Sequence, residues 1–206
     1  MNKFDVARQA MGLITRDHGP IDGADTRPGA YTVYAGLLGL GGGGAGAACT
    51  NGSGNPIADA AKAEMDKGVH ETPDNSNRNT DIDEYTGGTA KPWSPDFVSW
   101  VYNKANSPFT GGATEDWRLG SVAAISGWLQ ANGQYTTRQD NSFEPQAGDV
   151  IIIAQNGTAA DHVGIIYAIT TNSSITTIEG NVRGAVVSKT YSTYTANARI
   201  IGWGRK

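Results

Sequence analysis

The chain is nearly free of cysteine. Cys49 is the single cysteine among 206 residues. One cysteine excludes an internal disulfide. A catalytic thiol also needs a base close by, and Cys49 has no histidine beside it in the sequence. We therefore interpret Cys49 as an incidental thiol.

The sequence also lacks an excess of basic residues and a long apolar run. Charged residues make up 17% of the chain and the formal net charge is -4. This mild acidity gives no electrostatic footprint for nucleic acid and no basic patch for anionic lipid. No apolar run approaches the roughly 20 residues of a transmembrane helix, so none is expected. Nothing points to a nucleotide or a redox cofactor.

No basic region followed by an apolar one marks a secretory signal at the start of the sequence. If the protein acts outside the cell that makes it, we expect one of three routes. The signal has been removed, the protein is released by lysis, or it is delivered with a phage particle or a secretion machine.

Glycine is abundant, with 28 residues, and many of them fall in the first quarter of the chain. Residues 3–17 have the spacing of a short amphipathic helix. Residues 19–54 then run through a glycine-rich and alanine-rich stretch. They are either a flexible linker or a small apolar segment that docks on a partner. We therefore divide the chain into an N-terminal segment, residues 1–54, and a domain of residues 55–206.

The pattern of the domain changes from helical to extended along the chain. Helices are predicted after Asn55, which can cap one, and over 120–132. Strands are predicted over five later segments, because short apolar runs there alternate with turn residues: 149–154, 162–170, 175–179, 185–191 and 199–203. Helices first and a bent antiparallel sheet later are typical of the α+β class.

A capped helix is predicted around residues 91–102. Ser94 has the side chain of an N-cap, and Pro95 suits the first helical position because it lacks an N–H. Asp96 complements the helix dipole, and Phe97 begins an apolar stripe. On this evidence alone, the segment is a core helix.

Residues 93–101 resemble the nucleophile motif Trp-Cys-x-x-Phe-Val-Ser-Trp-Val of the CHAP family, the cysteine- and histidine-dependent amidohydrolases and peptidases. In that family the residue after the tryptophan is the catalytic cysteine. Ser94 occupies this position here. The resemblance implies a papain-like α+β fold, with N-terminal helices packed on the bent antiparallel sheet.

The second half of the domain carries further resemblance in four pieces, which extend the similarity over about residues 56–206: Pro145-x-x-Gly148-Asp149-Val150, His162-Val163-Gly164-Ile165, Thr177-Ile178-Glu179-Gly180-Asn181 and Ile201-Gly202-Trp203-Gly204-Arg205. Strand parity places His162 and Gly164 on one face, where Gly164 would admit a helix end. A hairpin through residues 171–174 brings Glu179 back to the end where His162 lies. Parity alone leaves His162 equally open to a structural role, bonded to its own loop.

The resemblance assigns roles to these residues. It implies that His162 is the general base or imidazolium partner of residue 94. Glu179 orients His162, Asn181 assists as a further polar group, and Trp93 contacts the substrate.

The resemblance also raises the question of a metal. No cofactor is required, but some members of the family bind calcium near the nucleophile helix. Asp81, Asp83, Tyr85 and Asp96 would supply oxygen ligands here. The alternative, which we favour, is a solvated acidic loop plus a first-turn aspartate.

The family cleaves bacterial peptidoglycan, at the amide joining glycan to stem peptide or within the peptide, so we expect action at the cell wall. Ser94 leaves three readings. It is a deliberate Cys→Ser change in a native enzyme, or it marks a natural pseudoenzyme that binds wall fragments, or it is the nucleophile of a working Ser94–His162–Glu179 hydrolase. A further alternative places the chain in a phage or secretion particle. We favour the first reading and expect the protein as written to be inactive or nearly so.

Overall fold

A computed structural model describes residues 53–140, 142–170 and 173–206. The predictions for the N-terminal helix, the glycine-rich stretch and Cys49 therefore lie outside the described residues. Within the described part, four α-helices precede or flank a six-stranded sheet. No helix there is long and apolar enough to cross a membrane.

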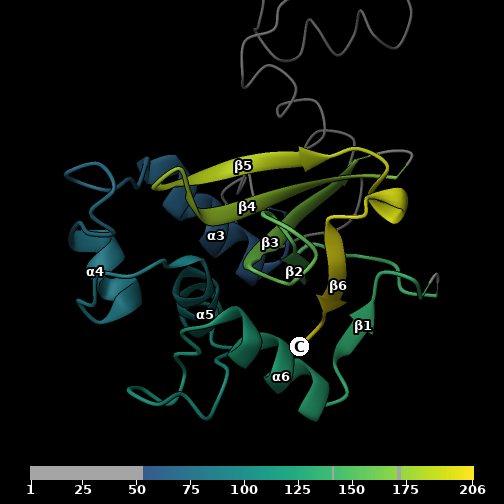
Figure 1. The fold of residues 1–206 in the computed structure, drawn as a ribbon, viewed down its shortest axis with the longest axis horizontal. Coiled ribbons are helices and arrows are strands. Elements are labelled where there is room, and N and C mark those ends of the chain that lie inside the picture. The colour runs from purple at the N-terminus through teal and green to yellow at the C-terminus, as the bar shows by residue number, and fades with distance from the viewer. Residues whose placement is uncertain (1–52, 141, 171–172) are drawn as a thin grey trace, which may run out of the picture. The chain divides into compact units, whose positions relative to one another are not determined.

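The helices come first in the chain (Figure 1). They are α3 (Pro56–Lys67), α4 (Thr80–Thr86), α5 (Ser94–Lys104) and α6 (Val122–Ala131). The predicted cap of α3 is confirmed, because Asn55 Oδ1 accepts from the N–H of Ile57 at 2.9 Å. Gly68 closes the helix with φ 71°, a left-handed conformation that glycine adopts without strain.

The strands follow as β1 (Tyr135–Thr137), β2 (Val150–Ile153), β3 (His162–Thr170), β4 (Ser174–Val182), β5 (Ala185–Tyr191) and β6 (Ile200–Gly204). A 3-10 turn, Tyr194–Ala196, precedes β6. Every pairing is antiparallel, in the order β1-β6-β2-β3-β4-β5. Register shifts interrupt three of the ladders, and such bulges bend a sheet. The predicted α+β fold is confirmed.

Apolar residues cover both faces of the central strands. On β2, Val150 and Ile152 join a large cluster with the helices, whereas Ile151 and Ile153 join a smaller cluster with Trp203. Successive side chains of a strand point to opposite faces, so the sheet separates the two clusters. Burial on both faces explains why β2 reads as a continuous apolar run in the sequence.

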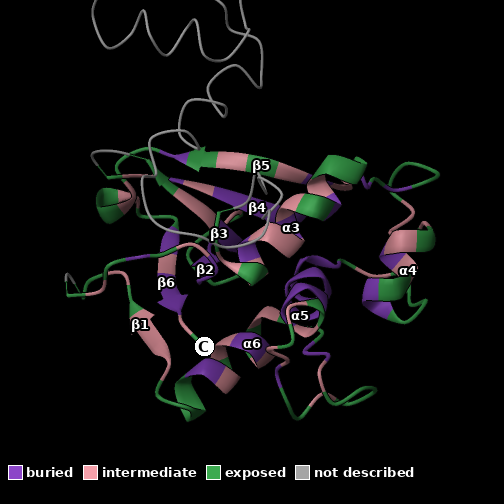
Figure 2. Cartoon of the chain, turned by 180° about the vertical axis from the view of Figure 1, so that it is seen from behind, coloured by how far each residue is buried: buried purple, intermediate pink, exposed green. Residues whose placement is uncertain are grey.

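Helix α5 is the most deeply buried helix of the described part (Figure 2). It packs against α3, α4, β3 and β4. Its residues from Ser94 to Tyr102 are all buried, not only the stripe that helical spacing predicted. A helix with protein on every side has no solvent face, which is why polar Ser99 is enclosed and bonds to the backbone of Leu119.

The structure corrects three local predictions. Residues 80–86 form helix α4 rather than an acidic loop, and β1 was not predicted. Both segments are too short to show a period. The cap of α4 is Asn79, whose Oδ1 accepts from the N–H of Ile82 at 2.7 Å. Ser94 is also not the N-cap of α5: the helix includes it, and Trp93 precedes it without a side-chain cap.

We predict that Gly180→Ala destabilises the fold by about 1–3 kcal/mol, because overpacking in a filled core has that cost. A Cβ at position 180 would lie 2.7 Å from both Trp93 Cζ3 and Phe97 Cβ. Urea unfolding measures the change. The matched control is Gly127→Ala in α6, where a Cβ meets nothing within 4 Å. The control should gain about 0.5–1 kcal/mol. Equal effects of the two changes would contradict this packing.

Candidate active site

His162 and Glu179 form a buried pair on neighbouring strands. His162 is the first residue of β3, and Glu179 lies on β4 just before its bulge. His162 Nε2 lies 2.8 Å from Glu179 Oε2, and the side chains are 5% and 0% exposed. The structure thus brings together the two residues that strand parity placed on one face.

Glu179 is surrounded by donors. Thr177 Oγ1 and the Tyr191 hydroxyl both donate to Oε1, at 2.7 and 2.8 Å. Lys189 Nζ lies 3.3 Å from Oε2. Burial by itself raises the pKa of Glu179, but the hydrogen bond and charge of His162, the Thr177 hydroxyl and the Lys189 charge outweigh it and hold that pKa below its usual value. The carboxylate is therefore ionised at neutral pH.

An ionised Glu179 fixes the orientation of the His162 ring. The carboxylate only accepts hydrogen bonds, so His162 Nε2 must carry the proton of their shared bond. In neutral imidazole the other nitrogen, Nδ1, is then an acceptor. Among the described residues no hydrogen bond occupies Nδ1, so it is available to take a proton.

The close neighbour of Gly164 is not the helix end that the sequence suggested. A Cβ there would lie 2.6 Å from Glu179 Cγ, so Gly164 makes room for the carboxylate side chain and not for a helix end. The helix end is admitted by Gly180 on β4 instead, against Trp93 and Phe97. Alternation on a single strand could not show which neighbour would come closest.

A bulge in β4 connects the buried pair to the start of α5. The ladder with β5 shifts register between Glu179 and Val182, and Asn181 has φ 61°. In the amide orientation that satisfies its neighbours, Asn181 accepts from the N–H of Trp93 at 3.0 Å and donates to Glu71 Oε1 at 3.3 Å. Asn181 therefore fixes the start of α5, and its amide is not the group that orients His162.

Ser94 follows Trp93 at this junction and is the first residue of α5. Because the helix begins at Ser94, its hydroxyl is not used as a cap. Within the described residues this hydroxyl makes no hydrogen bond, and the residue is 5% exposed. Ser94 is thus held at the positive end of the α5 dipole with a free hydroxyl, one residue after Trp93, whose N–H bonds to Asn181 of β4.

Trp93 is not placed to contact a substrate, which corrects the role that the resemblance offered. Its side chain is fully buried, and its ring packs against Tyr85 and Phe97. Its indole Nε1 donates to Glu71 Oε1 at 3.0 Å. A tryptophan that is closed off by core residues anchors the loop before Ser94.

Two residues of this site were not singled out from the sequence. Glu71 follows α3 in a turn-rich segment, and its carboxylate receives both the Trp93 indole and the Asn181 amide. Tyr191 ends β5 and donates to Glu179. Neither lies in a motif piece. Both residues are buried, and no motif or spacing in the sequence marks either of them.

The four candidate calcium ligands do not converge. Asp81 faces Lys67 at 3.7 Å, and Asp83 pairs with Arg78 at 2.6 Å. The Tyr85 hydroxyl donates to Glu64, and Lys91 Nζ lies 2.9 Å from Asp96 Oδ2. The described part of the chain holds no group of three or more His, Cys, Asp or Glu side chains suited to a metal ion. The residues present therefore do not fit calcium.

We predict that acid removes stability through Glu179. Its lowered folded-state pKa means that the carboxylate stabilises the fold above its unfolded pKa, near 4.5, and that this contribution is lost as pH falls through the lower folded value. Glu179→Gln should cost about 1–3 kcal/mol at pH 7, because buried donors lose their charged acceptor. The cost should shrink between about pH 5 and pH 3. Urea unfolding across this range measures it.

The matched control is Glu84→Gln, since Glu84 lies exposed on α4. It should change stability by no more than about 0.5 kcal/mol at any pH in that range. A Glu179→Gln penalty that stayed constant down to pH 3 would show that the carboxylate charge is not the stabilising feature.

The family model of the CHAP domain matches residues 85–181, a span that contains Ser94, His162 and Glu179. No curated protein matches the chain. Two solved structures resemble it: the crystal structure of Ly7917 with the hydrolyzing product of MDP, at TM-score 0.43 and 15% identity, and the crystal structure of Ly7917, at 0.42 and 18%.

Each alignment with Ly7917 covers 72% of this chain and 60% of that one. A likeness at this identity and TM-score says nothing about activity. The family match, which takes in both the nucleophile motif and the His162 and Glu179 strands, shows that residues 85–181 of this chain belong to a CHAP domain.

Proposed function

We propose that this chain is a peptidoglycan amide hydrolase whose nucleophile position holds serine, and that it acts at the bacterial cell wall. The observation that carries the proposal is the buried pair of His162 and Glu179, joined at 2.8 Å. Ser94 begins α5 directly after Trp93, whose N–H bonds to Asn181, two residues after Glu179. A nucleophile, an imidazole and a group that orients the imidazole are what acyl transfer needs.

The proton would move from residue 94 to His162. Glu179 holds the imidazole with Nε2–H toward the carboxylate, so Nδ1 accepts the proton. Residue 94 then attacks the carbonyl carbon of the scissile amide, and the imidazolium that forms is stabilised by Glu179. His162 next returns the proton to the leaving amine. Hydrogen bonds of this kind often tighten only when the substrate is bound.

The start of α5 supplies a place for the developing negative charge. The first N–H groups of a helix have no partner within it. Pro95 has no N–H, so the Ser94 N–H is the first-turn donor adjacent to the attacking atom. The helix has 11 residues, and its dipole adds a favourable potential at this end.

Serine at position 94 weakens the reaction. A cysteine at a helix N-terminus beside an imidazole forms a thiolate, which is already the reactive species. A serine hydroxyl is far less acidic, so His162 must remove its proton in the transition state. The protein as written should therefore have little or no activity, and it should still bind the wall peptides that the active form cleaves.

We predict that Ser94→Cys raises the rate of wall cleavage by at least about a hundredfold, the size of effect expected from a properly activated nucleophile. Purified cell walls are treated with the protein and with the cysteine variant, and turbidity and fragment masses are followed. The masses distinguish an amidase, which separates glycan from stem peptide, from an endopeptidase, which cuts within the peptide.

The matched control is Ser94→Cys combined with His162→Ala. This variant keeps the sulfur and removes the imidazole, so its cleavage should return to the level of the Ser94 protein. Clearing of walls by the Ser94 protein at the rate of the cysteine variant would contradict the inactivity. If neither form cleaves but both bind wall fragments saturably, the chain is a binding protein and the hydrolase proposal fails.

A further inference from the structure

A small pocket lies beside the residues that anchor the start of α5. Its volume is about 230 Å³, and it opens to solvent between the segment after α3 and the β4–β5 turn. Six residues line it: His70, Glu71, Asp74, Asn75, Arg183 and Gly184. A bridge between His70 and Ala185 and a hydrogen bond from the Glu71 N–H to the Gly184 carbonyl, at 2.8 Å, join the two walls.

Glu71 connects this pocket to the candidate active site. It is 4% exposed, and its Oε1 accepts from the Trp93 indole. Its Oε2 has no hydrogen bond among the described residues, and it lies on the side of Gly184, 3.1 Å from where a Cβ would stand. A buried carboxylate with one oxygen committed and the other directed toward a pocket wall is suited to bind a cationic group.

Arg183 occupies a position that disfavours it. Val182 pairs with Ala185, so Arg183 and Gly184 are the two residues of the β4–β5 turn. Their φ angles are 52° and 75°. Two-residue turns with both φ values positive prefer Asn-Gly, because a left-handed conformation strains most other residues. The structure gives Arg183 no salt bridge within the described residues, so its guanidinium is free to bind a ligand.

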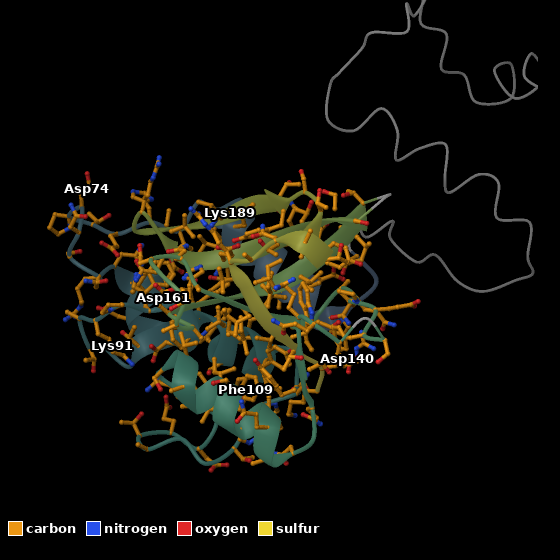
Figure 3. All side chains as sticks on the ribbon, turned by 45° about the vertical axis from the view of Figure 1, so that its right-hand side comes forward. Asp74, Lys91, Phe109, Asp140, Asp161 and Lys189 are labelled. Atoms are coloured by element: carbon orange, nitrogen blue, oxygen red, sulfur yellow. The ribbon has the colours of Figure 1, made fainter. Side chains whose placement is uncertain are left out.

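The pocket therefore presents both signs of charge within a small volume. Arg183 offers the planar fork that matches a carboxylate, whereas Glu71 and Asp74 offer oxygens to an ammonium. Asp74 lies on the outlying loop between α3 and α4 (Figure 3). A carboxylate alone would meet the two acidic side chains, and an ammonium alone would meet Arg183.

We propose that this pocket is a subsite for the free amino-acid end of a diamino acid, an ammonium and a carboxylate on one carbon. The inference rests on the proposed function, since the peptides of the cell wall contain diamino acids whose side chains can end in such a group. Arg183 would bind the carboxylate, and Glu71 and Asp74 the ammonium. Because Glu71 also holds Trp93, a side chain bound here would place its peptide close to residue 94.

The test compares two tripeptides, L-Ala-γ-D-Glu-meso-diaminopimelate and L-Ala-γ-D-Glu-L-Lys. They differ by the side-chain carboxylate. Isothermal titration calorimetry with the full Ser94 chain should show that the diaminopimelate peptide binds at least about tenfold more tightly, the size expected for one charge-assisted pair. Equal affinity for the two peptides would overturn the subsite.

The variant Arg183→Asn separates binding from folding. Asparagine tolerates the left-handed conformation, so this change should raise the thermal midpoint of unfolding while reducing affinity for the diaminopimelate peptide at least about tenfold. The lysine peptide should be unaffected by it. Arg199→Gln is the control, because Arg199 is exposed and does not line the pocket. Unchanged affinity in Arg183→Asn would show that Arg183 does not bind the carboxylate.

This experiment is independent of hydrolysis, since it needs no cleavage. If the Ser94→Cys variant cleaves walls while the chain binds both tripeptides equally, the hydrolase stands and the subsite fails. If the diaminopimelate peptide binds selectively and the cysteine variant does not cleave, the subsite stands and the hydrolase fails.

Discussion

The contact between the start of α5 and the bulge of β4 is the constraint on which the site depends. Gly180 lets Trp93 and Phe97 lie against the strand, and Asn181 accepts the N–H of Trp93. The bulge turns the Asn181 side chain toward the helix while Glu179, two residues earlier, stays with His162. One irregular point in a strand thus holds both the start of α5, where Ser94 lies, and the carboxylate that is bonded to His162.

The buried charge of Glu179 is the second determinant. An isolated carboxylate would be costly to bury, but Thr177, Tyr191, Lys189 and His162 all face it. These partners come from three different strands, so the charge also links the strands at this end of the sheet. These partners offset the free-energy cost of burying the carboxylate. The carboxylate in turn keeps the proton on His162 Nε2, so that Nδ1 is left as a hydrogen-bond acceptor.

Glu71 joins the two regions that the proposals concern. Its Oε1 holds the tryptophan before Ser94, and its backbone holds the β4–β5 turn through Gly184. Glu71 is therefore a single residue that connects the β4–β5 turn to the loop before Ser94. Arg183 holds a left-handed turn position and lines the same pocket as Glu71, so the proposed subsite adjoins the residue that anchors the loop before Ser94.

The sequence by itself determined the class of the fold and the identity of the family. The periods of α3, α6 and the five longer strands are long enough to read, and the pieces around Ser94, His162 and Glu179 have the order and spacing of a CHAP domain. Strand parity even placed His162 with Glu179. These features are local or depend on one hairpin, and local patterns survive in a sequence.

Only the tertiary structure decided which neighbours these residues meet. Ser94 is the first residue of α5 and not its cap, and Trp93 is fully buried. Gly164 makes room for Glu179, whereas Gly180 makes room for the start of the helix. The four candidate calcium ligands each bond to a different partner. The tertiary structure also brought Glu71 and Tyr191 into the site from outside every motif. Contacts between segments that lie far apart in the chain depend on how the elements pack, and no period or spacing along one segment carries that information.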